Sequence, residues 1–235
     1  MEIKMRDDEN KTIFGKIISI FWEPSATFRA LAVKTGWLDI VVPLLLVLLV
    51  SLAVTPHIMP LTVEEQKDYI AQSDRLTDEQ KAQAYDQVDQ RADLTRAYIV
   101  GAVFIVFRTA VVAGVLILFS NFLFGGEVKY KSMLAVSAYA NLVDIIANAV
   151  KVPLMLSQQT VRIYTSPALF LQDNSTFWFR FFANLDLFVL WKVILLGIGV
   201  GIITKVKTSK SIWTILICWI IYCLAVAGLG GLAKV

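Results

Sequence analysis

The sequence is short of the residues on which most enzymes and metal proteins depend. It has one histidine, His57, and two cysteines, Cys218 and Cys223, among its 235 residues. This set excludes a disulfide framework and a zinc site with four cysteine or histidine ligands. The sequence also contains no motif for a nucleophilic serine, a metalloprotease helix, a phosphate loop or a dinucleotide site. We therefore expect no catalytic residues, no bound metal, no cofactor and no enzymatic activity.

Charged residues are scarce as well. They make up 17% of the chain, whereas 57% of the residues are hydrophobic and the mean hydropathy is +0.66. A soluble domain is usually about 25% charged and about 45–50% apolar. The net charge of +3 is far from the dense positive surface of a nucleic-acid binder. These values predict a protein that lies in a lipid bilayer and has no nucleic-acid partner.

Five apolar runs predict an all-α membrane protein with five transmembrane helices. The predicted spans cover residues 37–55, 97–124, 132–150, 185–204 and 212–232. The third run is the least apolar, because it carries Asn141, Asp144 and Asn148. Residues 1–36 would then form an N-terminal amphipathic segment. Residues 37–235 would form the membrane domain, with an insert at 57–96 between the first two spans.

Lysines in the short loops predict the orientation of the chain. The loop after the second span and the loop after the fourth span carry Lys129, Lys131, Lys205, Lys207 and Lys210. Lysine and arginine favour the cytoplasmic side. Five spans then place the N-terminus in the cytoplasm and the C-terminus outside it. A chain without the weak third span would have both ends in the cytoplasm.

The segment before the first span predicts a helix that lies in the membrane interface. Residues 10–23 place five apolar side chains on one helical face, with Lys11 and Lys16 beside it, near anionic lipid. Those five residues are Ile13, Phe14, Ile17, Ile18 and Phe21. Pro24 is predicted to end this helix, and residues 25–33 to form a second one with Phe28 and Leu31 facing the same boundary. These two helices could anchor the first span or act as a wedge that shapes the membrane. The anchor is the favoured interpretation.

The insert predicts a helical hairpin outside the cytoplasm. Residues 64–93 hold nine carboxylates and four cationic side chains. Two capping boxes, Thr62-x-x-Glu65 and Thr77-x-x-Gln80, predict the starts of two helices that turn near residues 73–76. The second helix has no breaker and is expected to continue into the second span. The hairpin is either a solvated spacer or a docking stalk for a partner.

Three ionisable residues fall inside the predicted spans: Arg108, Asp144 and Lys192. At 1.5 Å per residue, each lies roughly 18–22 Å from the cytoplasmic end of its span, which predicts an internal charge cluster. Asn141, Asp144 and Asn148 are spaced i, i+3, i+7 and would give the third span a polar face. Either these groups neutralise one another, or they line a path for a proton or small ion. The first alternative is favoured, because an ion relay usually needs a chain of carboxylates.

Other features predict packing and interface contacts. Gly197-x-x-x-Gly201 and Ala110-x-x-x-Gly114 are pairs of small residues that permit close approach of helices. The aromatic block at residues 177–182 suits the interfacial belt outside the membrane core. Substrate binding by that block is a less favoured alternative.

Several short motifs together resemble the YIP family of five-pass membrane proteins. They are the pre-membrane Trp22-Glu23-Pro24-Ser25-x-x-Phe28 stretch, the Gly125-Gly126 turn, Tyr139 in the polar third span, and Leu185-Asp186-Leu187-Phe188-x-x-Trp191 at the start of the fourth. The resemblance covers nearly the whole chain and is clearest from about residue 119 to residue 229. It implies a five-helix domain with a cytoplasmic N-terminus. The acidic insert is longer than the family pattern.

What the resemblance implies about function depends on the branch of the family. The eukaryotic branch implies membrane traffic with Ypt and Rab GTPases. The short N-terminal arm of this chain is more similar to the bacterial branch and to an inner-membrane location. Some bacterial members resemble accessory subunits of MacB-like ABC exporters. Our first hypothesis is thus a non-enzymatic scaffold or accessory subunit that binds a membrane complex or itself; the alternatives are a small transporter that uses the charge cluster, and a membrane-shaping or trafficking protein.

Overall fold

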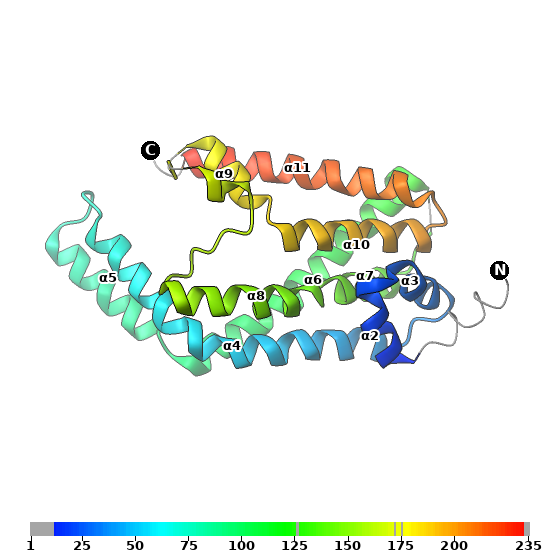
Figure 1. Cartoon of the computed structure of the whole chain (residues 1–235), viewed down its shortest axis with the longest axis horizontal. Coiled ribbons are helices and arrows are strands. Elements are labelled where there is room, and N and C mark those ends of the chain that lie inside the picture. The colour runs from blue at the N-terminus through cyan, green and yellow to red at the C-terminus, as the bar shows by residue number, and fades with distance from the viewer. Residues whose placement is uncertain (1–11, 126, 172, 175, 233–235) are drawn as a thin grey trace. The chain divides into compact units, whose positions relative to one another are not determined.

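The computed structural model describes residues 12–125, 127–171, 173–174 and 176–232, and in these ranges the regular structure is entirely helical (Figure 1). The chain divides into two compact units. The first combines residues 1–45, 108–144 and 164–235, and the second combines residues 46–107 and 145–163. The predicted all-α membrane fold is confirmed.

Four helical segments of the described chain are long and apolar enough to cross a membrane. They are α4 (Leu38–Ala71), α6 (Leu94–Phe124), α7 with α8 (Tyr130–Ala140 and Val143–Gln158) and α11 (Thr208–Leu232). A fifth span is present if α9 (Phe177–Asn184) and α10 (Leu187–Ile203) are counted as one, although they are bent by 54°. The protein is therefore an integral membrane protein with four to five spans.

The first predicted capping box is wrong, because α4 does not stop where the apolar run ends. The helix continues through Pro56 and Pro60 to Ala71. Thr62 lies inside it, and its hydroxyl donates to the carbonyl oxygen of Ile58 at 3.0 Å instead of capping a new helix. Each proline removes only one backbone donor, and a long helix that packs on neighbours tolerates this loss.

The second half of the hairpin is confirmed in part. The turn falls at residues 72–77, and α5 (Asp78–Arg91) starts with a complete capping box between Thr77 and Gln80. The prediction that this helix continues unbroken into the second span is wrong. The helix ends before Ala92, and Asp93 then accepts a hydrogen bond from the Arg96 N–H at 2.7 Å, which caps the new helix α6.

The third span can have a low hydropathy because much of it is buried within the protein. In the most apolar window of α7 with α8, 56% of the residues are buried, against 22% in α4 and in α6 and 17% in α11. A helix surrounded by protein does not need an apolar surface on every side, so polar residues are tolerated there. The segment is also interrupted at Asn141 and Leu142, which separate α7 from α8.

Helices α2 (Ile13–Trp22) and α3 (Pro24–Val33) lie in the first unit and pack against its other helices. Pro24 ends α2 as predicted and occupies the first position of α3, where its missing N–H costs nothing. The prediction that Phe28 and Leu31 face the membrane boundary is wrong, because both are completely buried. Helix α3 packs on α10 and α7, and these contacts remove its apolar side chains from lipid.

Lys16 also departs from its predicted place beside lipid headgroups. Its ammonium group forms a buried ion pair with the carboxylate of Asp39 at the start of α4. Asp39 accepts a second hydrogen bond from the Gly36 N–H at 2.8 Å. Of the five apolar residues predicted for the interface, Phe14 and Ile18 are exposed, whereas Ile13, Ile17 and Phe21 are half-buried.

Helices α10 and α11 lie side by side in the first unit (Figure 1), and glycines let them approach closely. A Cβ atom at Gly197 would lie 2.7 Å from Cα of Ile212, and one at Gly201 would lie 2.9 Å from Cα of Thr208. Gly114 in α6 is different, since a Cβ atom there would meet no heavy atom within 4 Å. The Gly197-x-x-x-Gly201 pair of α10 therefore marks a close approach of two helices, whereas Gly114 of the other pair does not.

The Gly197→Ala substitution is expected to destabilise the protein by about 1–3 kcal/mol, since the added methyl group would collide with the backbone of α11. Gly114→Ala is the matched control and is expected to be neutral or stabilising by up to about 1 kcal/mol, through helix propensity alone. Thermal unfolding in detergent measures both. Equal melting temperatures for the two variants would contradict the close approach of α10 and α11.

Candidate functional site

The three intramembrane charges meet in the first unit. Asp144 accepts hydrogen bonds from the Arg108 guanidinium at 2.7 Å and from the Lys192 ammonium at 2.9 and 3.0 Å. The sequence left open which cation pairs with Asp144, and the structure shows that both do. Helices α6, α8 and α10 are thereby joined through a single carboxylate. We call Arg108, Asp144 and Lys192 the charge cluster.

Polar neighbours orient the charge cluster. The Asn141 side chain donates to the Thr109 hydroxyl at 2.9 Å, and its amide oxygen lies 3.5 Å from Nη2 of Arg108. Asn141 also stands at the break between α7 and α8. Asn148 belongs to the second unit and takes no part in these contacts. Within the first unit, the polar face of the third span is thus formed by Asn141 and Asp144.

The charge cluster holds two cations and one carboxylate. The side chain of Lys192 is 14% exposed, that of Asp144 is 25% exposed and that of Arg108 is 39% exposed. Both oxygens of Asp144 are already bound by the two cations. The three side chains therefore connect their helices through direct ion pairs within the unit.

The family-like residues of α3, α7 and α10 have structural roles in the same unit. Asp186 caps α10, since its carboxylate accepts from the N–H groups of Phe188 and Val189 at 2.9 and 3.2 Å. Trp191 packs edge-to-face against Phe21 with ring centroids 6.0 Å apart. Tyr139 is completely buried in α7. These contacts anchor the N-terminal helices and the start of α10.

Gly125 has a structural reason to be glycine. Its φ of +64° is left-handed, and it directly follows the last residue of α6. This conformation is the usual way to end a helix and favours glycine. Gly126, the other glycine of the predicted turn, lies outside the described residues.

The aromatic block forms a short helix of its own. Thr176 caps α9 through a hydrogen bond from the Phe179 N–H at 3.1 Å. Trp178 is exposed, whereas Phe179 is buried and packs against Tyr164 with ring centroids 5.2 Å apart. The belt interpretation of the block stays a prediction.

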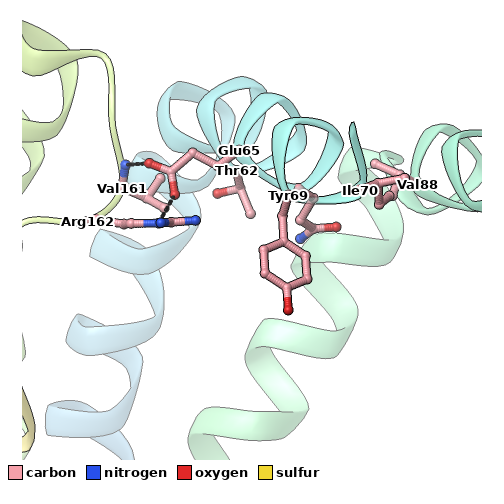
Figure 2. Close-up of a pocket in the computed structure, with 8 residues that line it drawn as sticks. Thr62, Glu65, Tyr69, Ile70, Val88, Val161 and Arg162 are labelled. Carbon is pink, nitrogen blue, oxygen red and sulfur yellow. Dashed lines mark hydrogen bonds and ion pairs between the residues drawn. The ribbon is translucent and has the colours of Figure 1, made fainter. Parts of the chain in front are cut away.

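A groove in the second unit is the other candidate site (Figure 2). Its volume is about 470 Å³, and most of its lining is apolar. We call it the hairpin groove. Its lining residues are Thr62, Glu65, Gln66, Tyr69, Ile70, Val88, Val161 and Arg162.

Glu65 organises one end of the hairpin groove, as the dashed lines in Figure 2 show. Its carboxylate accepts from the Val161 N–H at 2.8 Å and from Nε of Arg162 at 3.0 Å, and also from the hydroxyl of Thr160. Partial burial raises the pKa of Glu65, but these donors and the Arg162 charge outweigh that effect and lower it below its ordinary value. The carboxylate is therefore charged at neutral pH and holds the segment after α8 onto α4.

The open side of the hairpin groove is apolar and lies next to acidic surface. Tyr69 lines the groove and is 68% exposed, so much of its side chain is open to the surroundings. Lys67 of α4 forms an ion pair with Asp89 of α5 at 2.6 Å, which ties the two arms of the hairpin together. The carboxyl-bearing residues Glu64, Asp68, Asp78, Glu79 and Asp86 are exposed on the same two helices.

Sequence reasoning missed two of these arrangements. The local sequence of Glu65 predicts a capping box and gives no sign of a contact with residues almost a hundred positions away. The pair of Lys16 with Asp39 did leave a signal. Asp39 is the only charge within the first apolar run, and a carboxylate in such a place needs a partner.

No group of three or more histidine, cysteine, aspartate or glutamate side chains in the described part of the chain is placed to hold a metal ion. The contacts of both candidate sites instead join helices to one another or leave a surface open.

Membrane-spanning helices with an internal charge cluster and docked N-terminal helices define a helical integral membrane protein. Comparison with protein families identifies it further: residues 18–230 match the Yip1 domain, and the chain belongs to that family. Its members are generally non-catalytic membrane proteins. The same comparisons gave no match among curated proteins and none among solved structures.

Proposed function

We propose that this protein is a non-enzymatic accessory subunit, which binds a membrane protein complex through the hairpin groove. The observation that carries the proposal is an apolar groove of about 470 Å³ on a polar hairpin, with the exposed side chain of Tyr69 in its lining. The hairpin buries little of its own surface: in α5 no side chain is buried. An apolar groove that is bounded at one end by the Glu65 contacts on such a hairpin is suited to receive part of another protein.

The loop lysines support a cytoplasmic N-terminus and a hairpin outside the cytoplasm. Within the first unit, Lys131 lies 4.9 Å from the ring of Trp37, and Lys210 lies 5.7 Å from the ring of Phe124. These contacts gather the starts of α4, α7 and α11 near the end of α6, as expected if both basic loops lie on one side of the membrane. In the bacterial inner membrane the hairpin would then face the periplasmic parts of an exporter of the MacB-like ABC class.

The experiment is affinity purification from native membranes in mild detergent, with two groove variants and one matched control. Tyr69→Ala removes an exposed ring, and Val88→Glu places a charge in the apolar lining. Gln83→Glu adds the same charge to an exposed position of α5 outside the groove. Exporter subunits should copurify with the wild type and with Gln83→Glu, and fall at least about tenfold with both groove variants.

Two results would overturn the proposal. One is recovery of the protein alone from well-extracted membranes. The other is copurification of exporter subunits that is insensitive to both groove variants and to deletion of residues 64–93. The first result would favour a protein that acts by itself, as a transporter or a membrane-shaping protein.

A further inference from the structure

Arg108 uses only one of its nitrogens in the charge cluster. Its Nη2 atom makes the 2.7 Å contact with Asp144 and the 3.5 Å contact with Asn141. Among the described residues, neither Nη1 nor Nε has a hydrogen-bond partner. A guanidinium presents five N–H donors in a planar fork, and the fork can bind a second carboxylate while keeping the first.

The carboxylates near the cluster serve Lys192 better than Arg108. Asp144 is shared between Arg108 and Lys192, and Asp186 also acts electrostatically on Lys192, so Arg108 has only a share of one carboxylate. Arg108 lies near the middle of α6, 14 residues after its first residue and 16 before its last. A cation that is only partly paired is costly at that depth in a bilayer. A carboxylate from outside the chain would complete the pairing of Arg108.

The side of α6 from which Arg108 emerges is open. Val111, Val115, Leu118 and Phe122 are exposed, and their spacing of three or four residues places them on the Arg108 side of the helix. We call this surface, in the first unit, the Arg108 face. It combines an apolar stripe with a half-paired guanidinium. A second copy of this chain would bring another Arg108 to this face and not a carboxylate, so charge complementarity disfavours self-association through it.

We propose that the Arg108 face binds a transmembrane helix of a partner protein that carries an aspartate or glutamate at mid-depth. The carboxylate would occupy the unused Nη1 and Nε side of Arg108, and the apolar stripe would pack against the rest of the partner helix. This inference rests on the proposed function, because both require a partner membrane protein. It differs in naming a contact inside the bilayer and the chemistry of that contact.

The test places a photoreactive amino acid at Val111 or Val115 of the full-length protein in native membranes. Ile217 of α11 is the matched control, since it is also exposed on a predicted span but lies on another helix. Peptide mapping of the crosslinked product identifies the segment captured. The expected product from the two α6 positions, and not from Ile217, is a transmembrane segment of a second protein that contains aspartate or glutamate.

Two variants link the crosslink to the charge. Arg108→Leu leaves Lys192 paired with Asp144, so the protein is expected to stay folded while the crosslink falls at least about tenfold. Arg108→Lys keeps the charge and is expected to retain most of the crosslink. Arg108→Glu is expected to abolish the crosslink. Replacing the mapped carboxylate residue of the partner by arginine should then restore the crosslink to the Arg108→Glu variant.

Three outcomes would overturn the inference: crosslinks only to lipid, crosslinks only to a second copy of this chain, or a partner segment without a carboxylate. Each is distinct from failure of the proposed function. If groove variants abolish copurification while no acidic segment is captured at Val111 or Val115, the accessory role stands and the intramembrane contact does not. If an acidic segment is captured while groove variants leave copurification unchanged, the intramembrane contact stands and the role of the hairpin groove does not.

Discussion

Asp144→Asn is expected to destabilise the folded protein by about 3–5 kcal/mol, because it leaves the Arg108 and Lys192 cations without their shared carboxylate. An asparagine keeps the size and the hydrogen-bonding oxygen of the side chain, so the change isolates the lost charge. The expected result is a large drop in melting temperature in detergent, with reduced accumulation of the protein in membranes.

The control is to remove the whole cluster. Replacing Arg108, Asp144 and Lys192 together by leucine leaves no unpaired ion, and exchange of a buried ionic network for apolar residues is often neutral or stabilising. The triple variant is therefore expected to be more stable than Asp144→Asn. A transporter that used these groups would behave differently: Asp144→Asn would stay folded and lose ion-coupled flux. That outcome would contradict the structural role assigned to the cluster.

The cluster illustrates what the sequence was able to predict. Depth along a helix follows from residue count, so Arg108, Asp144 and Lys192 could be placed at one level from the sequence alone. Which cation takes the carboxylate depends on how the helices are rotated about their axes, and no local pattern determines that rotation. The structure resolves the choice by giving Asp144 to both cations.

The wrong predictions for the first capping box and for Phe28 have a shared physical origin. Thr62-x-x-Glu65 has the composition of a helix start, yet α4 runs through it, because the C-terminal part of the helix is held by contacts of Glu65 with Val161 and Arg162. Phe28 has the amphipathic spacing of an interfacial residue, yet α3 is packed against α10. In both cases a tertiary contact decides the outcome, and tertiary contacts are not encoded in short sequence windows.

The contact between the N-terminal helices and the first span is expected to depend on the Lys16–Asp39 pair. Lys16→Met should destabilise the protein by about 3–5 kcal/mol, because a buried carboxylate loses its cation. Asp39 would keep the N–H of Gly36 but lose its ammonium partner. Lys34→Met is the matched control, since Lys34 is exposed and its loss should change stability by no more than about 0.5 kcal/mol.

The double variant Lys16→Met with Asp39→Leu distinguishes the cost of leaving Asp39 without its cation from the cost of losing the Lys16 side chain itself. It removes both charges, and its stability should return to within about 1 kcal/mol of the wild type. If Lys16 instead contacted anionic lipid, Lys16→Met would resemble Lys34→Met in stability and would weaken binding of the N-terminal segment to anionic vesicles. Thermal unfolding of the four proteins in neutral and in anionic lipid nanodiscs distinguishes the two cases: a buried pair predicts the same ranking in both lipids, because the interaction that is lost lies within the protein.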